Sequence, residues 1–450
     1  MQGSLQTRLV SVGELLQNKS LQIPLYQRPY KWSLRNVMQL MDDIVHHQDR
    51  SSYRLGTIVL HRDRGRSNIV DGQQRIVTLF LILQAVLKHR SSLQNPELAS
   101  ELNKLRGEPL GLSFRSEISI ANLRTNYREI ERRISSIEES AILFLLKKCE
   151  VLQFVLSDIS EAFQFFDSQN ARGRALEPHD LLKAFHLREF AKEAESTRLE
   201  AVQTWESLET NELAGLFAEF LFRVRAWSQG KSGSHFGKDD VRIFKGISLE
   251  RMDAPFTQLL RIAHFYLEDY NESYHRKIDG QQAHFPFQLT QPILNGRRFF
   301  EMVSYYHAMR VEYHKNVTED WSQRPETRPL FVALSTYEGR RRVGDQYVRN
   351  LFDCAVLMYL DKFGEAALPQ ALEKIFVWAY TLRLRSIAVR LASVDNYVLH
   401  ESNLFQRIQH AVTPQDVLLL KVPSVQKVRS TKTHAIEQLF VSMGYHETKR

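Results

Sequence analysis

The sequence predicts an α+β protein, with a small mixed N-terminal domain followed by a large, mostly α-helical region. Residues 1–90 alternate short β-branched runs with turns and amphipathic helices, whereas residues 200–450 show helical periodicity almost throughout. In addition, a strand pattern at 67–70 passes through an Asp-Gly turn directly into an apolar helix. We therefore divide the chain into three predicted parts, which are residues 1–95, 96–195 and 196–450.

Composition restricts the class of protein. The chain has 450 residues, 43% hydrophobic and 25% charged, which is ordinary for a globular protein with a substantial core. Its two cysteines, Cys149 and Cys354, are far apart and form no C-x-x-C pair, so neither a disulfide framework nor a cysteine zinc site is expected. The net charge of +8 permits nucleic-acid contact without requiring it.

Targeting segments are not expected. The N-terminus lacks a basic stretch followed by an apolar run, so no signal peptide is predicted. The apolar stretches are too short or too broken by polar residues to span a bilayer. These features predict a cytoplasmic protein that makes no membrane contact.

The elements of the N-terminal part follow from local patterns. Two prolines in residues 21–32 exclude a regular helix and favour an extended segment. Residues 53–60 are strand-like, and a turn at 63–66 joins them to the strand at 67–70 as a hairpin. Ser33 can cap a helix whose apolar positions recur at i, i+3, i+4 and i+7, namely Val37, Leu40, Met41 and Ile44.

The remaining segments are mostly helical. Residues 97–150 are highly charged, and the mixed charges of 124–134 are interpreted as a solvated helix face. A strand is expected at 152–159, and a helix from Pro178, since proline suits a first helical turn. Further helix-like runs occupy residues 213–227, 256–268, 299–313, 348–363 and 366–384.

The turn at residues 71–75 (Asp-Gly-Gln-Gln-Arg) is the leading candidate site. It lies where a strand becomes a helix, so free backbone N–H groups and the positive end of the helix dipole favour an anion such as phosphate. Arg75 can bind phosphate oxygens in a fork, and Asp71 can hold a metal ion on those phosphates or cap the turn. The alternative is a tight turn with a capped helix and no ligand.

Residues 26–32 (Tyr-Gln-Arg-Pro-Tyr-Lys-Trp) offer a second half for such a site. Arg28 adds a permanent cation, and Gln27 adds a donor and an acceptor suited to a base, a sugar or water. The aromatic residues Tyr26, Tyr30 and Trp32 either pack in the core or stack on a base, and core packing is favoured.

These motifs resemble a known family. Residues 23–32 (Ile-Pro-Leu-Tyr-Gln-Arg-Pro-Tyr-Lys-Trp), 55–58 (Leu-Gly-Thr-Ile) and 71–75 are similar to the N-terminal ParB-like domain of GmrSD-type modification-dependent restriction proteins. Residues 166–183, with Phe-Asp-Ser-Gln-Asn-Ala-Arg-Gly and a following Asp-Leu-Leu-Lys, resemble that family's second signature. The resemblance covers about residues 10–190.

The resemblance implies a ParB/sulfiredoxin-like fold that binds a nucleoside triphosphate with Mg²⁺, often hydrolyses it, and serves in defence against phage. Residues 1–95 would form the nucleotide-binding core, and residues 96–195 would complete the cleft. The residues implied in catalysis are Asp71, Gln73, Gln74 and Arg75. The residues implied in nucleotide binding are Gln27, Arg28, Pro29, Tyr30, Gly56, Thr57, Gly72, Asn170, Arg172, Gly173 and Lys183.

One departure from the family matters. Relatives carry a C-terminal HNH-type nuclease motif, which this chain lacks, because His400-Glu401-Ser402-Asn403 has suitable residue types but neither the expected proline nor a second histidine. No P-loop pattern occurs, and no resident metal site is predicted. A partner subunit is therefore expected to carry the nuclease.

Three hypotheses remain open from the sequence. The first is an NTP-binding and NTP-hydrolysing subunit that regulates DNA cleavage by a partner, with residues 196–450 binding DNA or that partner. The second is a non-catalytic module that binds nucleotide or DNA. The third is a self-contained nuclease with a divergent C-terminal site. DNA, a protein subunit and a homo- or hetero-oligomer are the expected partners.

Overall fold

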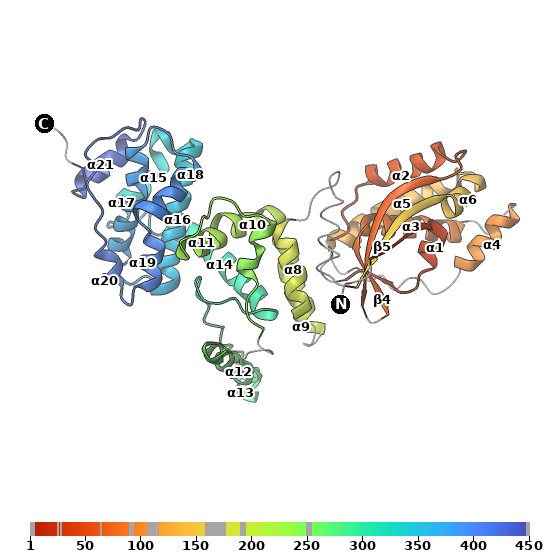
Figure 1. Ribbon diagram of the computed structural model, residues 1–450, viewed down its shortest axis with the longest axis horizontal. Coiled ribbons are helices and arrows are strands. Elements are labelled where there is room, and N and C mark those ends of the chain that lie inside the picture. The colour runs from red at the N-terminus through yellow and green to blue at the C-terminus, as the bar shows by residue number, and fades with distance from the viewer. Residues whose placement is uncertain are drawn as a thin grey trace. The chain divides into compact units, whose positions relative to one another are not determined.

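The chain forms two compact units, residues 1–176 and 177–450. Figure 1 shows the computed structural model, coloured along the chain. The structure describes residues 5–24, 27, 29–63, 65–89, 94–105, 114, 117–157, 177–189, 195–248 and 254–446.

The N-terminal unit is built on a five-stranded mixed sheet. Its strand order is β1-β5-β3-β4-β2, with β3 antiparallel to β4 and parallel to β5, β1 antiparallel to β5, and β2 parallel to β4. The strands are β1 Gln6–Ser11, β2 Leu21–Gln22, β3 Tyr53–Asp63, β4 Arg66–Asp71 and β5 Cys149–Leu156. The predicted hairpin of β3 and β4 is confirmed, as is a strand near residue 152.

The sheet is completed by a strand that arrives late in the chain. β5 pairs with β1 on one side and with β3 on the other, so it lies inside the sheet rather than at its edge. A register shift between Arg54 and Gly56 interrupts the pairing of β3 with β5. Helices α4–α6 and strand β5 therefore belong to the same unit as the first ninety residues.

Six described helices accompany the sheet (Figure 1). They are α1 Val12–Gln17, α2 Leu34–His46, α3 Gln73–His89, α4 Pro96–Leu105, α5 Glu117–Ile134 and α6 Glu139–Lys147. In α2 the buried residues are the four predicted from periodicity, Val37, Leu40, Met41 and Ile44. These four residues pack in one hydrophobic core with side chains from one face of the sheet. That face contributes Ile58 and Leu60 of β3 and Val151 and Val155 of β5.

The C-terminal unit is helical, which together with the N-terminal sheet confirms the α+β class. It contains α8 Pro178–Glu189, α9 Glu195–Ser207, α10 Thr210–Gly215, η1 Leu216–Leu221, α11 Phe222–Ser228, η2 Lys238–Phe244, η3 Pro255–Thr257, α12 Gln258–Glu272, α13 Tyr274–Asp279, α14 Arg297–Glu319, α15 Arg328–Thr336, η4 Glu338–Arg341, α16 Val343–Phe363, α17 Leu368–Arg385, α18 Leu391–Asn396, η5 Tyr397–Glu401, α19 Leu404–His410, α20 Pro414–Leu418 and α21 His434–Ser442.

The core of this unit centres on α16 and α17, whose inner residues are buried almost completely, including Phe352, Trp378 and Tyr380. The helix predicted at 213–227 is observed, but a π-helical turn, η1, divides it between α10 and α11. Among the described helices, none combines the length and the hydropathy that a bilayer-spanning segment needs.

A substitution in α2 tests this core assignment. Met41 is 1% exposed whereas Val45, on the same helix, is 38% exposed. We expect Met41→Ala to lower the free energy of unfolding of the N-terminal unit by about 2–5 kcal/mol, since it leaves a cavity, and Val45→Ala by less than about 1 kcal/mol. Urea unfolding of the full chain, with hydrogen exchange reporting on β3 and β5, measures both, and equal effects would contradict the assignment.

Candidate functional site

The Asp-Gly turn places the start of α3 at the end of β4. Gly72 has φ of +89°, and a Cβ there would lie 2.8 Å from Ile58 Cγ1, so only glycine fits without displacement. The first hydrogen bond of the helix runs from the Ile76 amide to the Gly72 carbonyl, at 2.9 Å. The amides of residues 73–75 therefore precede the helical ladder, at the positive end of the helix dipole.

The Arg75 side chain ties this helix end to the neighbouring strand. Its Nη1 donates to the Thr57 carbonyl of β3 at 3.1 Å, which is its one hydrogen bond among the described residues. The guanidinium lies against Gly56, where a Cβ would approach Nη2 to 3.0 Å and where φ is +118°. Burial lowers the pKa of Arg75, and the charge of Asp71 acts in the opposite direction.

Gln74 holds the proline-rich segment against α3. Its Oε1 accepts hydrogen bonds from the amides of Lys31 at 2.8 Å and Trp32 at 3.1 Å. Its Nε2 donates to the Pro29 carbonyl at 3.2 Å. Both ends of the amide thus bind backbone, so Gln74 positions residues 29–32 beside the turn, as the pairing of the two motifs predicts.

Tyr30 points into the core of the unit rather than toward solvent. It is fully buried, its hydroxyl is 2.8 Å from Thr78 Oγ1, and burial raises its pKa. Three polar residues of α5, spaced i, i+3 and i+7, hydrogen-bond the segment around it, and they are Ser119, Asn122 and Asn126. The sequence interpretation missed them because the exposed charges of the same helix dominate its pattern.

Gln27 contacts the strand that leads into the turn. Its Nε2 donates to the carbonyls of Ile69 at 2.8 Å and Val70 at 2.7 Å. Gln73 is buried at the first position of α3. The structure thus brings Gln27, Pro29, Tyr30, Gly56, Thr57, Asp71, Gly72, Gln73, Gln74 and Arg75 around one strand end and one helix start.

Five of the predicted nucleotide-binding residues fall outside the part of the N-terminal unit that the structure describes. Arg28, Asn170, Arg172 and Gly173 lie outside the described residues, as does Tyr26. Lys183 belongs to the C-terminal unit, where it is 4% exposed and forms an ion pair with Glu206 at 3.0 Å.

The segment His400-Glu401-Ser402-Asn403, which begins in η5, has structural partners. Glu401 pairs with Arg385 at 3.0 Å, the Ser402 carbonyl accepts from Trp378 Nε1 at 3.0 Å, and Asn403 caps α19 by accepting from the Gln406 amide. Throughout the described part of the chain, no group of three or more His, Cys, Asp or Glu side chains is arranged to hold a metal ion.

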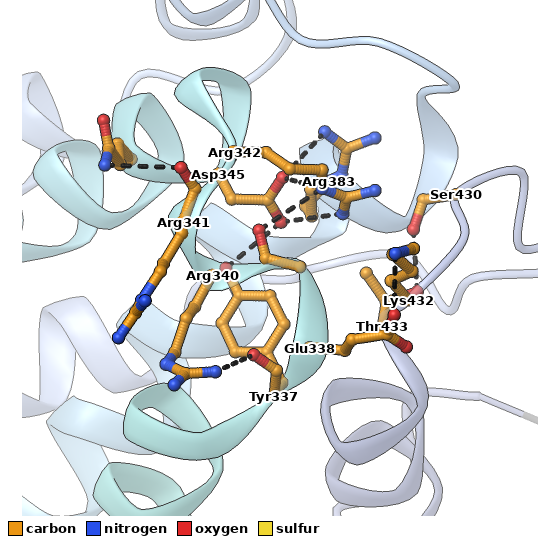
Figure 2. Close-up of polar contacts among 12 residues, drawn as sticks. Tyr337, Glu338, Arg340, Arg341, Arg342, Asp345, Arg383, Ser430, Lys432 and Thr433 are labelled. Atoms are coloured by element: carbon orange, nitrogen blue, oxygen red, sulfur yellow. Dashed lines mark hydrogen bonds and ion pairs between the residues drawn. The ribbon is translucent and has the colours of Figure 1, made fainter.

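A buried carboxylate organises the basic region of the C-terminal unit. Figure 2 shows Asp345 between Arg342 and Arg383. Asp345 is fully buried, with Arg342 Nε at 2.8 Å and Arg383 Nη1 at 3.6 Å, and its Oδ1 accepts from the Tyr337 hydroxyl at 3.1 Å. Nearby, Lys432 pairs with Glu338 at 2.7 Å. These pairs fix three distant segments to one another.

Next to this network lies a groove of about 490 Å³, whose charged lining residues are Arg385, Lys427, Arg429 and Glu401. The segment between α20 and α21 is basic, since residues 419–433 contain four Lys/Arg and no Asp or Glu. Its backbone is anchored by the Arg429 amide, which donates to the Leu384 carbonyl at 2.8 Å. Among the described residues, no carboxylate pairs with Lys427 or Arg429, so the groove carries net positive charge.

Comparison with known families agrees with this two-unit architecture. Residues 12–187 match the GmrSD restriction endonuclease, N-terminal domain. Residues 197–435 match a family of unknown function, DUF7834. The chain thus belongs to the DUF7834 family, and its N-terminal unit carries a GmrSD-type N-terminal domain. The GmrSD-type domain indicates a component of a restriction, or anti-phage, system. No curated protein matches it.

The contact between Gly56 and Arg75 gives a test of the site's geometry. We expect Gly56→Ala to destabilise the N-terminal unit by about 1–3 kcal/mol, because the methyl group adds backbone strain and displaces the guanidinium. In an Arg75→Ala background the new methyl group no longer meets the guanidinium, so Gly56→Ala should destabilise the unit less. The difference between the two effects, which is the interaction energy of the double-mutant cycle, should exceed about 0.5 kcal/mol. Urea unfolding of the four variants measures it, and strictly additive effects would contradict the contact.

Proposed function

We propose that this protein is an NTP-binding and NTP-hydrolysing subunit of a restriction system, which regulates DNA cleavage by a partner. The N-terminal unit would act as a ParB/sulfiredoxin-like nucleotide-binding domain, and the C-terminal unit would contact DNA. The observation that carries the proposal is the Arg75 guanidinium, held by the Thr57 carbonyl beside the amides that open α3.

This arrangement suits a phosphate for electrostatic reasons. An arginine has five N–H donors and stays protonated, and one of them is engaged by Thr57 among the described residues. Helix N-terminal amides add further donors, and the helix dipole adds positive potential. A phosphate would therefore satisfy both groups at once, whereas the alternative of a merely capped turn leaves the remaining guanidinium donors to water.

The other residues divide into contact and positioning roles under this proposal. Gln74 and Tyr30 bind backbone and core groups, so they would position the 29–32 segment rather than touch the ligand. Mg²⁺ usually binds proteins through one or two carboxylates plus substrate phosphates, so Asp71 alone would suffice as the protein ligand. No multi-residue metal cluster is needed for this chemistry.

Replacing Arg75 tests nucleotide binding. With ATP, GTP, CTP and UTP tried separately in Mg²⁺, we expect Arg75→Ala to weaken binding of the preferred nucleotide at least about tenfold, since a charge-assisted hydrogen bond contributes about 1.5–3 kcal/mol. Arg75→Lys should fall between, because it keeps the charge but loses the fork. Arg66→Ala, an exposed arginine on β4, is the matched control. Calorimetric titration measures the affinities, and unchanged binding by Arg75→Ala would refute the assignment.

Turnover separates the two leading hypotheses. Phosphate release that requires Mg²⁺ and Arg75 supports an NTP-driven regulatory subunit. Binding without release supports the non-catalytic module instead. The self-contained nuclease requires metal-dependent DNA cutting by this chain alone, and its candidate segment near Glu401 is engaged in structural contacts.

The basic groove supports DNA contact by the C-terminal unit. Lys427 and Arg429 lie two residues apart on an anchored segment and line the groove together with the Arg385–Glu401 ion pair. Such a row of cations matches a phosphate backbone, because each cation that neutralises a phosphate releases a counterion. The nearby carboxylates Glu338, Asp345 and Glu401 are already paired with other cations, so they do not cancel the charge of Lys427 and Arg429.

A double substitution in the groove tests this contact. We expect Lys427→Ala/Arg429→Ala to weaken binding of duplex DNA and to reduce the slope of log K against log salt by about 2, roughly 1 for each phosphate contact removed. Lys231→Ala/Lys315→Ala removes two exposed lysines elsewhere on the unit and should leave the slope unchanged. Fluorescence anisotropy at several salt concentrations measures this, and equal slopes in both double variants would exclude the groove.

A further inference from the structure

Helix α12 is attached to the C-terminal unit by its polar side. Glu268 forms ion pairs with Arg297 at 2.9 Å and with Arg298 at 2.6 Å, both from α14. One turn earlier, His264 Nδ1 accepts from Arg298 Nε at 3.0 Å, and the Arg298 side chain is only 5% exposed. Residues 264 and 268 share one helix face, so this charged face is the one turned toward the protein.

The opposite side of α12 is apolar and exposed. Leu259, Ile262 and Tyr266, spaced i, i+3 and i+7, are 75%, 64% and 65% exposed. This is the reverse of an ordinary surface helix, whose apolar stripe faces the core. Four neighbours extend the surface, and they are Phe256 at 63%, Phe265 at 49%, and Tyr274 and Ile278 of α13 at 74% and 66%. We call these seven residues the α12–α13 apolar face.

The concentration of exposed apolar residues here is unusual for the molecule. The α12–α13 apolar face supplies seven of the twenty large hydrophobic residues that are exposed among the described positions, within one short helical hairpin. Figure 1 shows this hairpin at the edge of the C-terminal unit. Contiguous exposed apolar surfaces of several hundred Å² mark interaction sites.

The area of the face matches an interface between two proteins. An aromatic side chain offers about 150–250 Å², and these seven large side chains, half to three-quarters exposed, together present on the order of 1,000 Å². A standard interface buries about 800 Å² on each partner. One copy of the hairpin therefore provides enough surface for a complete interface, without a contribution from another part of the chain.

The charges on the same exposed arc complement a second copy. Arg261, which lies 5.4 Å from the Phe265 ring, is exposed in the first half of α12, and Asp269 is exposed in the second half. If two α12 helices cross antiparallel with a two-fold axis near Phe265, Arg261 of each copy lies opposite Asp269 of the other. Such a self-complementary surface is the requirement for an isologous dimer.

We propose that two copies of this protein associate through the α12–α13 apolar face, with the two α12 helices antiparallel. The apolar stripe supplies the stabilisation, and the Arg261–Asp269 pairs set the direction. The dimer carries two basic grooves, so one DNA molecule bound by both gains affinity through avidity. The association itself does not depend on the nucleotide or DNA proposals.

Sedimentation of the full chain tests the dimer. The wild-type protein should sediment as a particle of twice the 52.6-kDa chain mass at micromolar concentration. Ile262→Glu/Tyr266→Glu should be monomeric, with the dissociation constant raised at least about 100-fold, because each substitution places a charge in the apolar interface. Ile387→Glu and Val412→Glu, at still more exposed apolar positions elsewhere, should remain dimeric.

Charge reversal distinguishes this antiparallel pairing from non-specific hydrophobic association. Arg261→Glu or Asp269→Arg alone should weaken the dimer by about tenfold, and the two together should restore it, since the pair is re-formed with reversed polarity. Circular dichroism confirms that each variant is folded. A wild-type chain that stays monomeric up to about 100 μM, a dimer that survives Ile262→Glu/Tyr266→Glu, or a failure of the reversed pair to recover would overturn the proposal.

Discussion

The contact of the Arg75 guanidinium with β3 is the constraint on which the N-terminal site depends. A cation that is partly withdrawn from water must have polar partners, and the Thr57 carbonyl provides one. The close approach requires glycine at position 56, where the register of β3 against β5 shifts and φ is positive. A second positive-φ glycine, Gly72, lets the chain turn into α3 against Ile58. The glycines at positions 56 and 72 are therefore required by the backbone geometry around Arg75, independently of any ligand.

The two units use buried polar contacts in the same way, to fix segments that are far apart in the sequence. In the N-terminal unit, Gln74 and the polar side of α5 hold residues 29–32 in place. In the C-terminal unit, Asp345 joins α16 to α17 through Arg383. Because the carboxylate of Asp345 is engaged by Arg342 and Arg383, it does not neutralise Lys427 and Arg429 in the groove.

Sequence patterns predicted correctly those elements whose conformation depends mainly on residues close together in the chain. The inner face of α2, the β3–β4 hairpin and the strand-to-helix turn before Arg75 follow from periodicity and turn chemistry, and each is found as expected. The insertion of β5 between β1 and β3 depends on long-range pairing, which periodicity does not encode. The role of Gln74 was also hidden, because an amide suits a ligand and a backbone clamp equally well. The basic groove draws on segments near residues 385 and 427, which no single window unites.

The central claim is that the start of α3 and Arg75 bind a nucleoside triphosphate. Hydrogen exchange of the full chain, with and without a saturating, non-hydrolysable NTP and Mg²⁺, tests it most directly, since amides that donate to a phosphate exchange more slowly. We expect slower exchange confined to the amides of residues 73–75 and to those of residues 30–32, the segment that Gln74 holds. Unchanged exchange at those amides, at a nucleotide concentration where binding is complete, would contradict it.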